Sequence, residues 1–294
     1  MEQLSTLNEI QDEMLRLTSL CRDHVMKVFV DYGRPDSVVD MTLNRFFSYF
    51  SQRSQVVCHL TSIGYHWDAE IILRSFMEAA AKIWLICLHP NDQRENLVEE
   101  FLYITEKVDN RKMARRANIT QRLSQRINST ANTRVMEIFN NNELFEKDEL
   151  NKKARKELET KWSFSVIISY LEQNHPADFP MKDIESLLHT YGMGSHLLHS
   201  DRMALDLMLD RSLREPEELD ILTQAHCTRI WSDLAWLWYI SLTALKYRFE
   251  IGSLKDEIYA EFKMFADSCQ KIKEKFDDSQ NEFYKQYLNE MPPK

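Results

Sequence analysis

Glycine and proline are scarce in this chain and widely spaced. Five glycines and seven prolines are spread over 294 residues, so the segments between them are long. An all-β protein needs turn residues at about every 8–12 positions, and no Asn-Gly or Asp-Gly pair marks a tight hairpin. The sequence therefore predicts an all-α fold, a multi-helix bundle of about eight to nine helices.

The apolar residues repeat with the period of an α-helix. Between about residues 4 and 30 they recur at alternating steps of three and four, and the pattern returns over 254–291. Further helical segments are expected at 37–62, 66–89, 91–140, 143–174, 182–214 and 217–250. Breaks are expected near 128–132 and 140–142, where Asn, Ser and Thr cluster. We expect one helical domain over 1–294, with a more mobile middle segment at 110–160.

Composition limits the class of protein. Apolar residues make up 44% of the chain, enough for a buried core, and the net charge of −9 argues against a surface that is basic throughout. The five cysteines lack CxxC spacing, so reduced thiols are expected rather than disulfides or a zinc site. The uncharged run 234–245 is shorter than the roughly 20 residues of a membrane span. These features predict a soluble protein of the reducing cytoplasm.

The segment 66–89 carries two charges in an apolar setting. Apolar residues cover both sides of this helix, which indicates a central position in the bundle. Arg74 and Glu78 lie one turn apart and can pair along the helix. An unpaired charge there would cost several kcal/mol, so both side chains should find further partners. The pair is either a buried salt bridge or part of a site.

A second polar group lies within 182–214. Tyr191, Ser195 and His199 follow one another at intervals of four residues, and Arg202 and Asp206 continue the same ridge of a helix. Two hydroxyls and an imidazole on one face can relay a proton or hold a polar ligand. The alternative is a solvated helix flank.

No metal or cofactor site is expected. Glu185 and His199 bracket a line of histidines, but on a continuous helix they lie roughly 20 Å apart. Gly192 and Gly194, between them, are expected to bend or break the helix. The sequence also lacks a G-x-S-x-G elbow, a Walker loop and a dinucleotide glycine fingerprint.

A basic run reverses the sign of the charge in the middle of the chain. From residue 111 to 134 it contains no acid and these basic residues: Arg111, Lys112, Arg115, Arg116, Arg122, Arg126 and Arg134. Such a run is suited to the phosphates of RNA or DNA, although it has no aromatic residues for base stacking. The alternative is a solvated face that pairs with acidic neighbours or with a partner subunit.

Together the two polar segments resemble a bacterial all-helical family of unknown function. Its members pair a G-x4-A-x4-R-[ST]-x2-E helix with a Y-x3-S-x3-H helix. The matching residues here are Gly64, Ala69, Arg74, Ser75 and Glu78 in the first motif, and Tyr191, Ser195 and His199 in the second.

That family is similar in turn to the HEPN superfamily of helical bundles, which includes defence and toxin ribonucleases with an R-x4–6-H motif. The match to that spacing here is Arg53-x5-His59, on a different helix. The resemblance implies that Arg74 and Glu78 face Tyr191, Ser195 and His199 across the bundle. It also implies that His199 acts as a general acid or base whose pKa is adjusted by Glu78. Arg74 would then bind a phosphate or carboxylate group.

Two functions follow from the sequence. The first is a bacterial defence- or toxin-type effector, such as a HEPN-like ribonuclease, that acts on RNA or nucleotides. Its catalytic residues would be His199, Glu78, Arg74, Tyr191 and Ser195, and its substrate-binding residues Arg111, Arg115, Arg116, Arg122 and Arg126. The second is a non-catalytic, oligomeric interaction or ligand-sensing module in which the same cluster is structural. In both, we expect no membrane contact and a homo-oligomer or partner protein held through the long amphipathic terminal helices.

Overall fold

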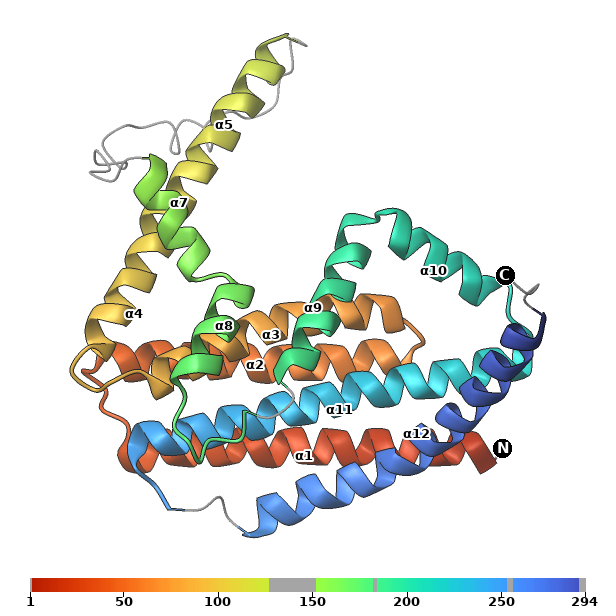
Figure 1. The fold of residues 1–294 in the computed structure, drawn as a ribbon. Helices are drawn as coiled ribbons and strands as arrows, with labels where there is room; N and C mark the ends of the chain where they lie inside the picture. The colour runs from red at the N-terminus through yellow and green to blue at the C-terminus, as the bar shows by residue number, and fades with distance from the viewer. Residues whose placement is uncertain (1, 127–151, 182–183, 253–255, 291–294) are drawn as a thin grey trace. The chain divides into compact units, whose positions relative to one another are not determined.

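The computed structural model describes residues 2–126, 152–181, 184–252 and 256–290. Within these ranges the regular elements are all helices and no strand occurs, so the all-α prediction is confirmed. The chain groups into two compact units, one made of residues 1–88 and 171–294 and the other of residues 89–170 (Figure 1). The sequence predicted a single domain. The breaks expected near 128–132 and 140–142, and Arg134, lie outside the described residues.

The first unit contains seven helices within the described ranges: α1 (Glu2–Tyr32), α2 (Val38–Ser62), α3 (His66–Leu88), α9 (Ile184–His199), α10 (Arg202–Ser212), α11 (Pro216–Phe249) and α12 (Asp256–Glu290). The second contains α4 (Arg94–Tyr103), the π-helix η1 (Ile104–Val108), α5 (Asp109–Arg126) and α7 (Lys152–Lys161). The boundary between the units falls within α8 (Phe164–Asn174).

The described residues form ten helical rods, because α4, η1 and α5 are continuous. The predicted count of eight to nine is low since two predicted segments are each split. The segment 143–174 divides between α7 and α8, and 182–214 divides at Ser200. There Ser200 adopts a left-handed backbone conformation (φ 49°), and the Asp201 carboxylate caps α10 by accepting the backbone N–H groups of Met203 and Ala204.

Helix α3 is the central helix of the first unit, as its apolar residues on both sides predicted. It packs against α2, α11 and α9, while α1 packs against α2, α11 and α12 (Figure 1). The aromatic centre of this core joins α2, α3 and α11. The rings of Phe50 and Phe76 stack with centroids 3.5 Å apart, and Trp238 meets Phe50 edge-on at 4.7 Å.

Three buried tryptophans fix how these helices align. Each donates its indole N–H to a hydroxyl on a neighbouring helix: Trp84 to Ser241 (2.9 Å), Trp231 to Thr61 (3.0 Å) and Trp238 to Ser54 (2.8 Å). A buried indole N–H without an acceptor would cost about 1–3 kcal/mol. These bonds therefore favour one register of α11 against α2 and α3.

The terminal helices of the first unit bury one stripe each. Helix α1 buries Ile10, Met14, Leu17 and Cys21, and it packs against α11 and α12. All five cysteines are buried and unbridged, as predicted. Among the helices that the structure describes, none has a stretch long and apolar enough to cross a membrane.

The second unit is held by polar and aromatic contacts between α4, α5 and α7. The indole of Trp162, just after α7, packs on Phe101 with centroids 4.9 Å apart and donates to Glu100 Oε1 at 2.9 Å. Lys161 Nζ contacts the same carboxylate at 2.7 Å. Lys112 of α5 pairs with Glu159 of α7 at 2.9 Å.

Candidate functional site

Helix α9 approaches α3 closely at a glycine. A Cβ added to Gly194 would lie 3.1 Å from Arg74 Cβ and 3.3 Å from the backbone oxygen of Glu70. The expected bend or break at Gly192 and Gly194 does not occur, because α9 continues from Ile184 to His199. Gly194 serves instead to let the two helices pack closely.

This approach brings together Arg74, Glu78 and Tyr191. The Arg74 guanidinium donates to Tyr191 Oη at 2.7 Å and lies 4.4 Å from the centre of the tyrosine ring. The Tyr191 hydroxyl donates to Glu78 Oε1 at 2.9 Å. Burial, followed by the neighbouring Glu78 carboxylate, raises the pKa of Tyr191, so the phenol is neutral. The side chains are partly exposed, 19% for Arg74 and 37% for Glu78, so the cluster lies at the edge of the core.

The structure places Ser195 and His199 differently from the implied arrangement. Ser195 is half-buried and His199 is exposed. The contacts of Glu78 with Tyr191 and of Arg74 with Gly194 show that α9 runs antiparallel to α3. His199 follows Tyr191 by eight residues, about 12 Å along the axis, in the direction away from Glu78. The implied pairing of His199 with Glu78 is therefore not formed.

The predicted substrate-binding arginines belong to the second unit. Arg111, Arg115, Arg116, Arg122 and Arg126 all lie on α5. The side chains of the last four are exposed.

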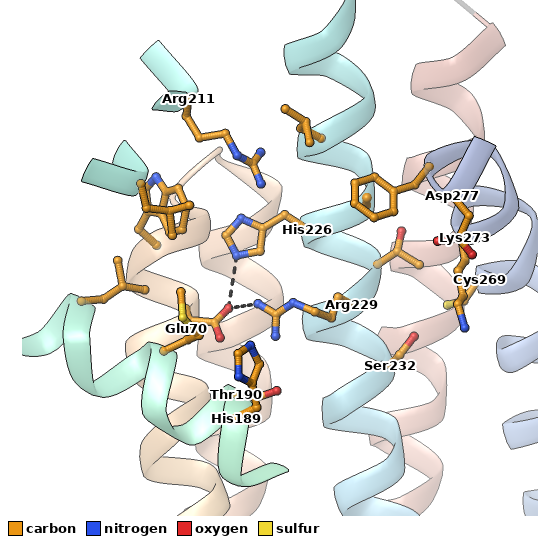
Figure 2. Close-up of a pocket in the computed structure, with 18 of the residues that line it drawn as sticks. Glu70, His189, Thr190, Arg211, His226, Arg229, Ser232, Cys269, Lys273 and Asp277 are labelled. Carbon is orange, nitrogen blue, oxygen red and sulfur yellow. Dashed lines mark hydrogen bonds and ion pairs between the residues drawn. The ribbon is translucent and has the colours of Figure 1, made fainter. Parts of the chain in front are cut away.

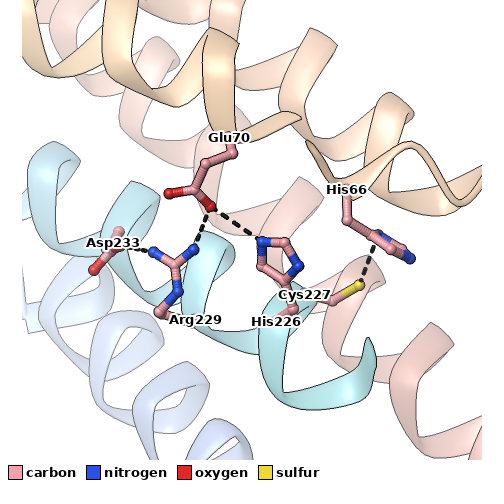
Figure 3. Close-up of polar contacts among 6 residues, drawn as sticks. All are labelled: His66, Glu70, His226, Cys227, Arg229 and Asp233. Atoms are coloured by element: carbon pink, nitrogen blue, oxygen red, sulfur yellow. Dashed lines mark hydrogen bonds and ion pairs between the residues drawn. The ribbon is translucent and has the colours of Figure 1, made fainter. Parts of the chain in front are cut away.

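A second polar network, not predicted from the sequence, joins α3 and α11 (Figure 3). Glu70, one turn before Arg74, has a side chain only 2% exposed. Its Oε2 atom accepts hydrogen bonds from His226 Nε2, at 3.1 Å, and from Arg229 Nη2. Arg229 Nη1 bonds to Asp233 Oδ2 at 3.1 Å. The steps of three and four between His226, Arg229 and Asp233 were the available sequence signal, since they place the three on one face of α11.

Burial and pairing set the charges of this network. Burial alone would raise the pKa of Glu70, but the hydrogen bond from His226 and the charge of Arg229 outweigh it and lower the pKa. Burial lowers the pKa of His226 despite the Glu70 carboxylate. Because an ionised carboxylate oxygen can only accept a hydrogen bond, a neutral His226 must carry its proton on Nε2, the atom that faces Glu70. The other ring nitrogen, Nδ1, is then a hydrogen-bond acceptor. Burial raises the pKa of Asp233 to about 6.

Cys227 and His66 form a close pair beside this network. The Cys227 sulfur lies 3.2 Å from His66 Nδ1. Burial raises the pKa of the Cys227 thiol to about 12. Burial, with His226 and Arg211 nearby, lowers the pKa of His66 to about 4. A nucleophilic cysteine needs a thiolate beside a cationic partner, so this neutral pair is not an activated nucleophile.

The Glu70 network borders a cavity of about 640 Å³ (Figure 2). Side chains of α3, α9, α10, α11 and α12 line it, and many of them are apolar, including Trp67, Met193, Leu197, Leu222 and Phe276. Ligand cavities in proteins are typically about 300–1,000 Å³ and are lined by apolar groups with a few polar ones. Within the described residues, no three His, Cys, Asp or Glu side chains are placed to hold a metal ion.

Two polar groups of this cavity have unused bonding capacity. Glu70 Oε1 is buried and has no hydrogen-bond partner among the residues that the structure describes. Arg211 is half-buried, and its guanidinium points toward His226 (Figure 2). Across the part of the chain that the structure describes, Arg211 forms no ion pair; its guanidinium lies over the Trp67 ring, 5.7 Å from the ring centre. The cavity therefore offers an acceptor at Glu70 and a cation at Arg211.

Comparison with known proteins relates part of the chain to a protein family. The model of a family of unknown function (DUF5677) matches residues 40–216. That range contains Glu70, the Arg74–Glu78–Tyr191 cluster, Arg211 and helix α5, whereas His226 and Arg229 follow it. No curated protein and no solved structure matches the chain significantly.

Proposed function

The chain belongs to this family of unknown function, and we propose that it is a ligand-binding module whose cavity in the first unit takes a nucleotide. This proposal combines the two functions predicted from the sequence. The role is that of the ligand-sensing module, and the ligand class, nucleotides, is that of the effector. One observation carries the proposal. The same cavity holds a guanidinium, at Arg211, and a buried carboxylate oxygen, at Glu70, and among the described residues the first has no ion-pair partner and the second has no donor.

Arg211 is the half-buried cation suited to an anion; Lys273 also lines the cavity, but it is exposed. Arg229 also lines the cavity, but its charge is matched by Glu70 and Asp233. Burial lowers the pKa of Arg211 by disfavouring the cation. A bound phosphate would relieve that cost and match the planar guanidinium with two hydrogen bonds.

The rest of the cavity is suited to a planar aromatic ring that carries N–H groups. Glu70 Oε1 can accept an N–H from a base, and neutral His226 offers a second acceptor. Trp67 and Phe276 supply apolar aromatic surface. A nucleotide combines an anion, an aromatic ring and N–H donors in one molecule of a size that fits the cavity.

The centre predicted from the sequence lies outside the lining of this cavity. The described residues that line the cavity do not include Arg74, Glu78, Tyr191, Ser195 or His199. We assign Arg74, Glu78 and Tyr191 the role of fixing α9, a wall of the cavity, against α3. For a catalytic form of this function we assign the proton acceptor to His226, whose ring is neutral. The HEPN-like relationship, the defence role and the homo-oligomer stay predictions.

Thermal unfolding with added ligands tests this proposal. The ribonucleoside monophosphates of adenine, guanine, cytosine and uracil are compared with the matching nucleosides and with inorganic phosphate. A ligand at about 100 times its Kd stabilises the folded protein by about 2.7 kcal/mol, so at least one nucleotide should raise the Tm, and more than its nucleoside does.

The control variant lies on the same helix as Arg211. Arg211→Gln should lose the advantage of the nucleotide over the nucleoside. Arg202→Gln changes an arginine that is 94% exposed and outside the cavity lining, so it should keep that advantage. The proposal fails if no nucleotide raises the Tm at millimolar concentration, or if both variants respond alike.

A further inference from the structure

Helix α5 carries three of its five arginines on one outward face. Of its 18 residues, only Ala117 is buried. At about 100° per residue, Arg115, Arg122 and Arg126 lie within about 20° of one line, and Ala117 lies about 160° away from Arg115. These three residues, the arginine ridge, extend roughly 17 Å along the helix.

The positive charges of the arginine ridge are not neutralised by acidic side chains of the described residues. Arg115, Arg122 and Arg126 are exposed and form no ion pair with any residue in the described ranges. The one lysine of the helix, Lys112, is paired with Asp109 and Glu159 instead. In a chain with a net charge of −9, such a face leaves a strong local potential for an anionic partner.

We propose that the arginine ridge binds the phosphate backbone of double-stranded DNA, with α5 lying in the major groove. Guanidinium groups match phosphate oxygens with paired hydrogen bonds. The helix has no aromatic side chain on which the bases of a single strand would stack. A duplex, whose bases already stack on one another, needs none.

Groove dimensions favour DNA over RNA. A helix with its side chains is about 10–12 Å across, which fits the major groove of B-DNA, about 12 Å wide. The major groove of an RNA duplex is deep and narrow and does not admit a helix. Because only Ala117 is buried, most of the circumference of α5 is open to such a partner.

A membrane surface fits this helix less well than a duplex does. A helix that lies on a membrane needs a broad apolar face with residues such as Trp, Phe or Leu opposite its basic face. Opposite the arginine ridge, α5 has Ala117, which is packed within the protein, and the exposed Met113. Its other exposed large apolar residues, Ile119 and Leu123, lie about 40° and 80° from Arg115 and so form no broad apolar face opposite the ridge. Contacts made to phosphates alone carry no sequence information, so the binding should be independent of DNA sequence.

Fluorescence anisotropy with a labelled DNA duplex of arbitrary sequence tests the proposal on the full chain. The duplex is titrated at several salt concentrations with the parent, with a ridge variant (Arg115→Gln, Arg122→Gln, Arg126→Gln), and with a charge-matched control (Arg116→Gln, Lys153→Gln, Lys156→Gln). The control removes the same charge from exposed positions of the same unit. Unchanged circular dichroism and Tm establish that each variant is folded.

Each phosphate contact to duplex DNA contributes about 0.9 to the slope of log K against log salt. The ridge variant should therefore lose about 2.7 of that slope and bind more weakly than the control at low salt. Equal binding by the two variants overturns the proposal. So does tighter binding of the parent to an RNA duplex, to single-stranded RNA or to phosphatidylserine vesicles at the same salt. Arg211→Gln should bind DNA as the parent does, so this result is independent of the nucleotide cavity.

Discussion

Replacing Glu70 by Ala removes the charge around which the polar groups of α3 and α11 are organised. The carboxylate is 2% exposed, and it accepts hydrogen bonds from His226, at 3.1 Å, and from Arg229. Breaking a buried ion pair by removing one partner costs about 3–5 kcal/mol when the other charge stays buried and uncompensated. Here Arg229 is 42% exposed and keeps its bond to Asp233. Water and Asp233 therefore offset part of the loss, and we expect a cost near the lower limit, about 3 kcal/mol.

A matched variant on the same helix isolates the effect of burial. Glu78 lies two turns further along α3, is 37% exposed, and accepts one hydrogen bond from Tyr191. Exposed pairs contribute at most about 1 kcal/mol, so Glu78→Ala should cost about that much. Urea unfolding of both variants, followed by circular dichroism at one pH, gives the two free energies. If Glu70→Ala costs no more than Glu78→Ala, the reasoning from burial is refuted.

Two further predictions concern Asp233 and Tyr191. Burial raises the pKa of Asp233 from 3.8 to about 6, so the folded chain holds this proton more tightly than the unfolded chain. The stability that Asp233 contributes is then complete below pH of about 4 and is lost as the pH rises through about 6. The stability of the parent relative to Asp233→Asn should fall by up to about 3 kcal/mol over that range, and a pH-independent difference in urea unfolding would count against it. Tyr191→Phe removes the hydroxyl that bridges Arg74 and Glu78, which are otherwise 3.5 Å apart; we expect a loss of about 1 kcal/mol in the same assay, and a loss above about 3 kcal/mol would contradict the half-buried placement.

Local pattern was sufficient to predict the fold class. The spacing of glycines and prolines predicted long helices, and the apolar residues on both sides of 66–89 predicted the central position of α3. The resemblance to a helical family implied that Arg74 and Glu78 face Tyr191, and the structure brings these three together. The split at Ser200 was missed, although Asp201 is a residue type that favours the start of a helix.

Which residues of two packed helices lie opposite each other could not be predicted from the residue spacing along one helix. Tyr191 and His199 share a face of α9, but only the antiparallel packing on α3 shows that His199 lies about 12 Å beyond Tyr191. Gly194 illustrates a second ambiguity, since a glycine in a helix can mark either a break or a close contact. Its role became clear only from the 3.1 Å approach to Arg74.

The Glu70 network was missed for a related reason. His226 is 156 positions from Glu70 in the chain, and nothing near either residue indicates the other. The cavity also requires Arg211 of α10 and side chains of α12, which meet only after the unit has folded. Such a site depends on tertiary packing rather than on any local motif.

Isothermal titration calorimetry with adenosine monophosphate tests the central claim, that Arg211 and Glu70 make this cavity a nucleotide site. The parent and Arg202→Gln should release the same heat and bind with the same Kd. Arg211→Gln should bind at least about tenfold more weakly, because a hydrogen bond to a charged group contributes about 1.5–3 kcal/mol. Equal affinities for Arg211→Gln and Arg202→Gln, or no binding by the parent of this or any of the other three ribonucleoside monophosphates, would contradict the claim.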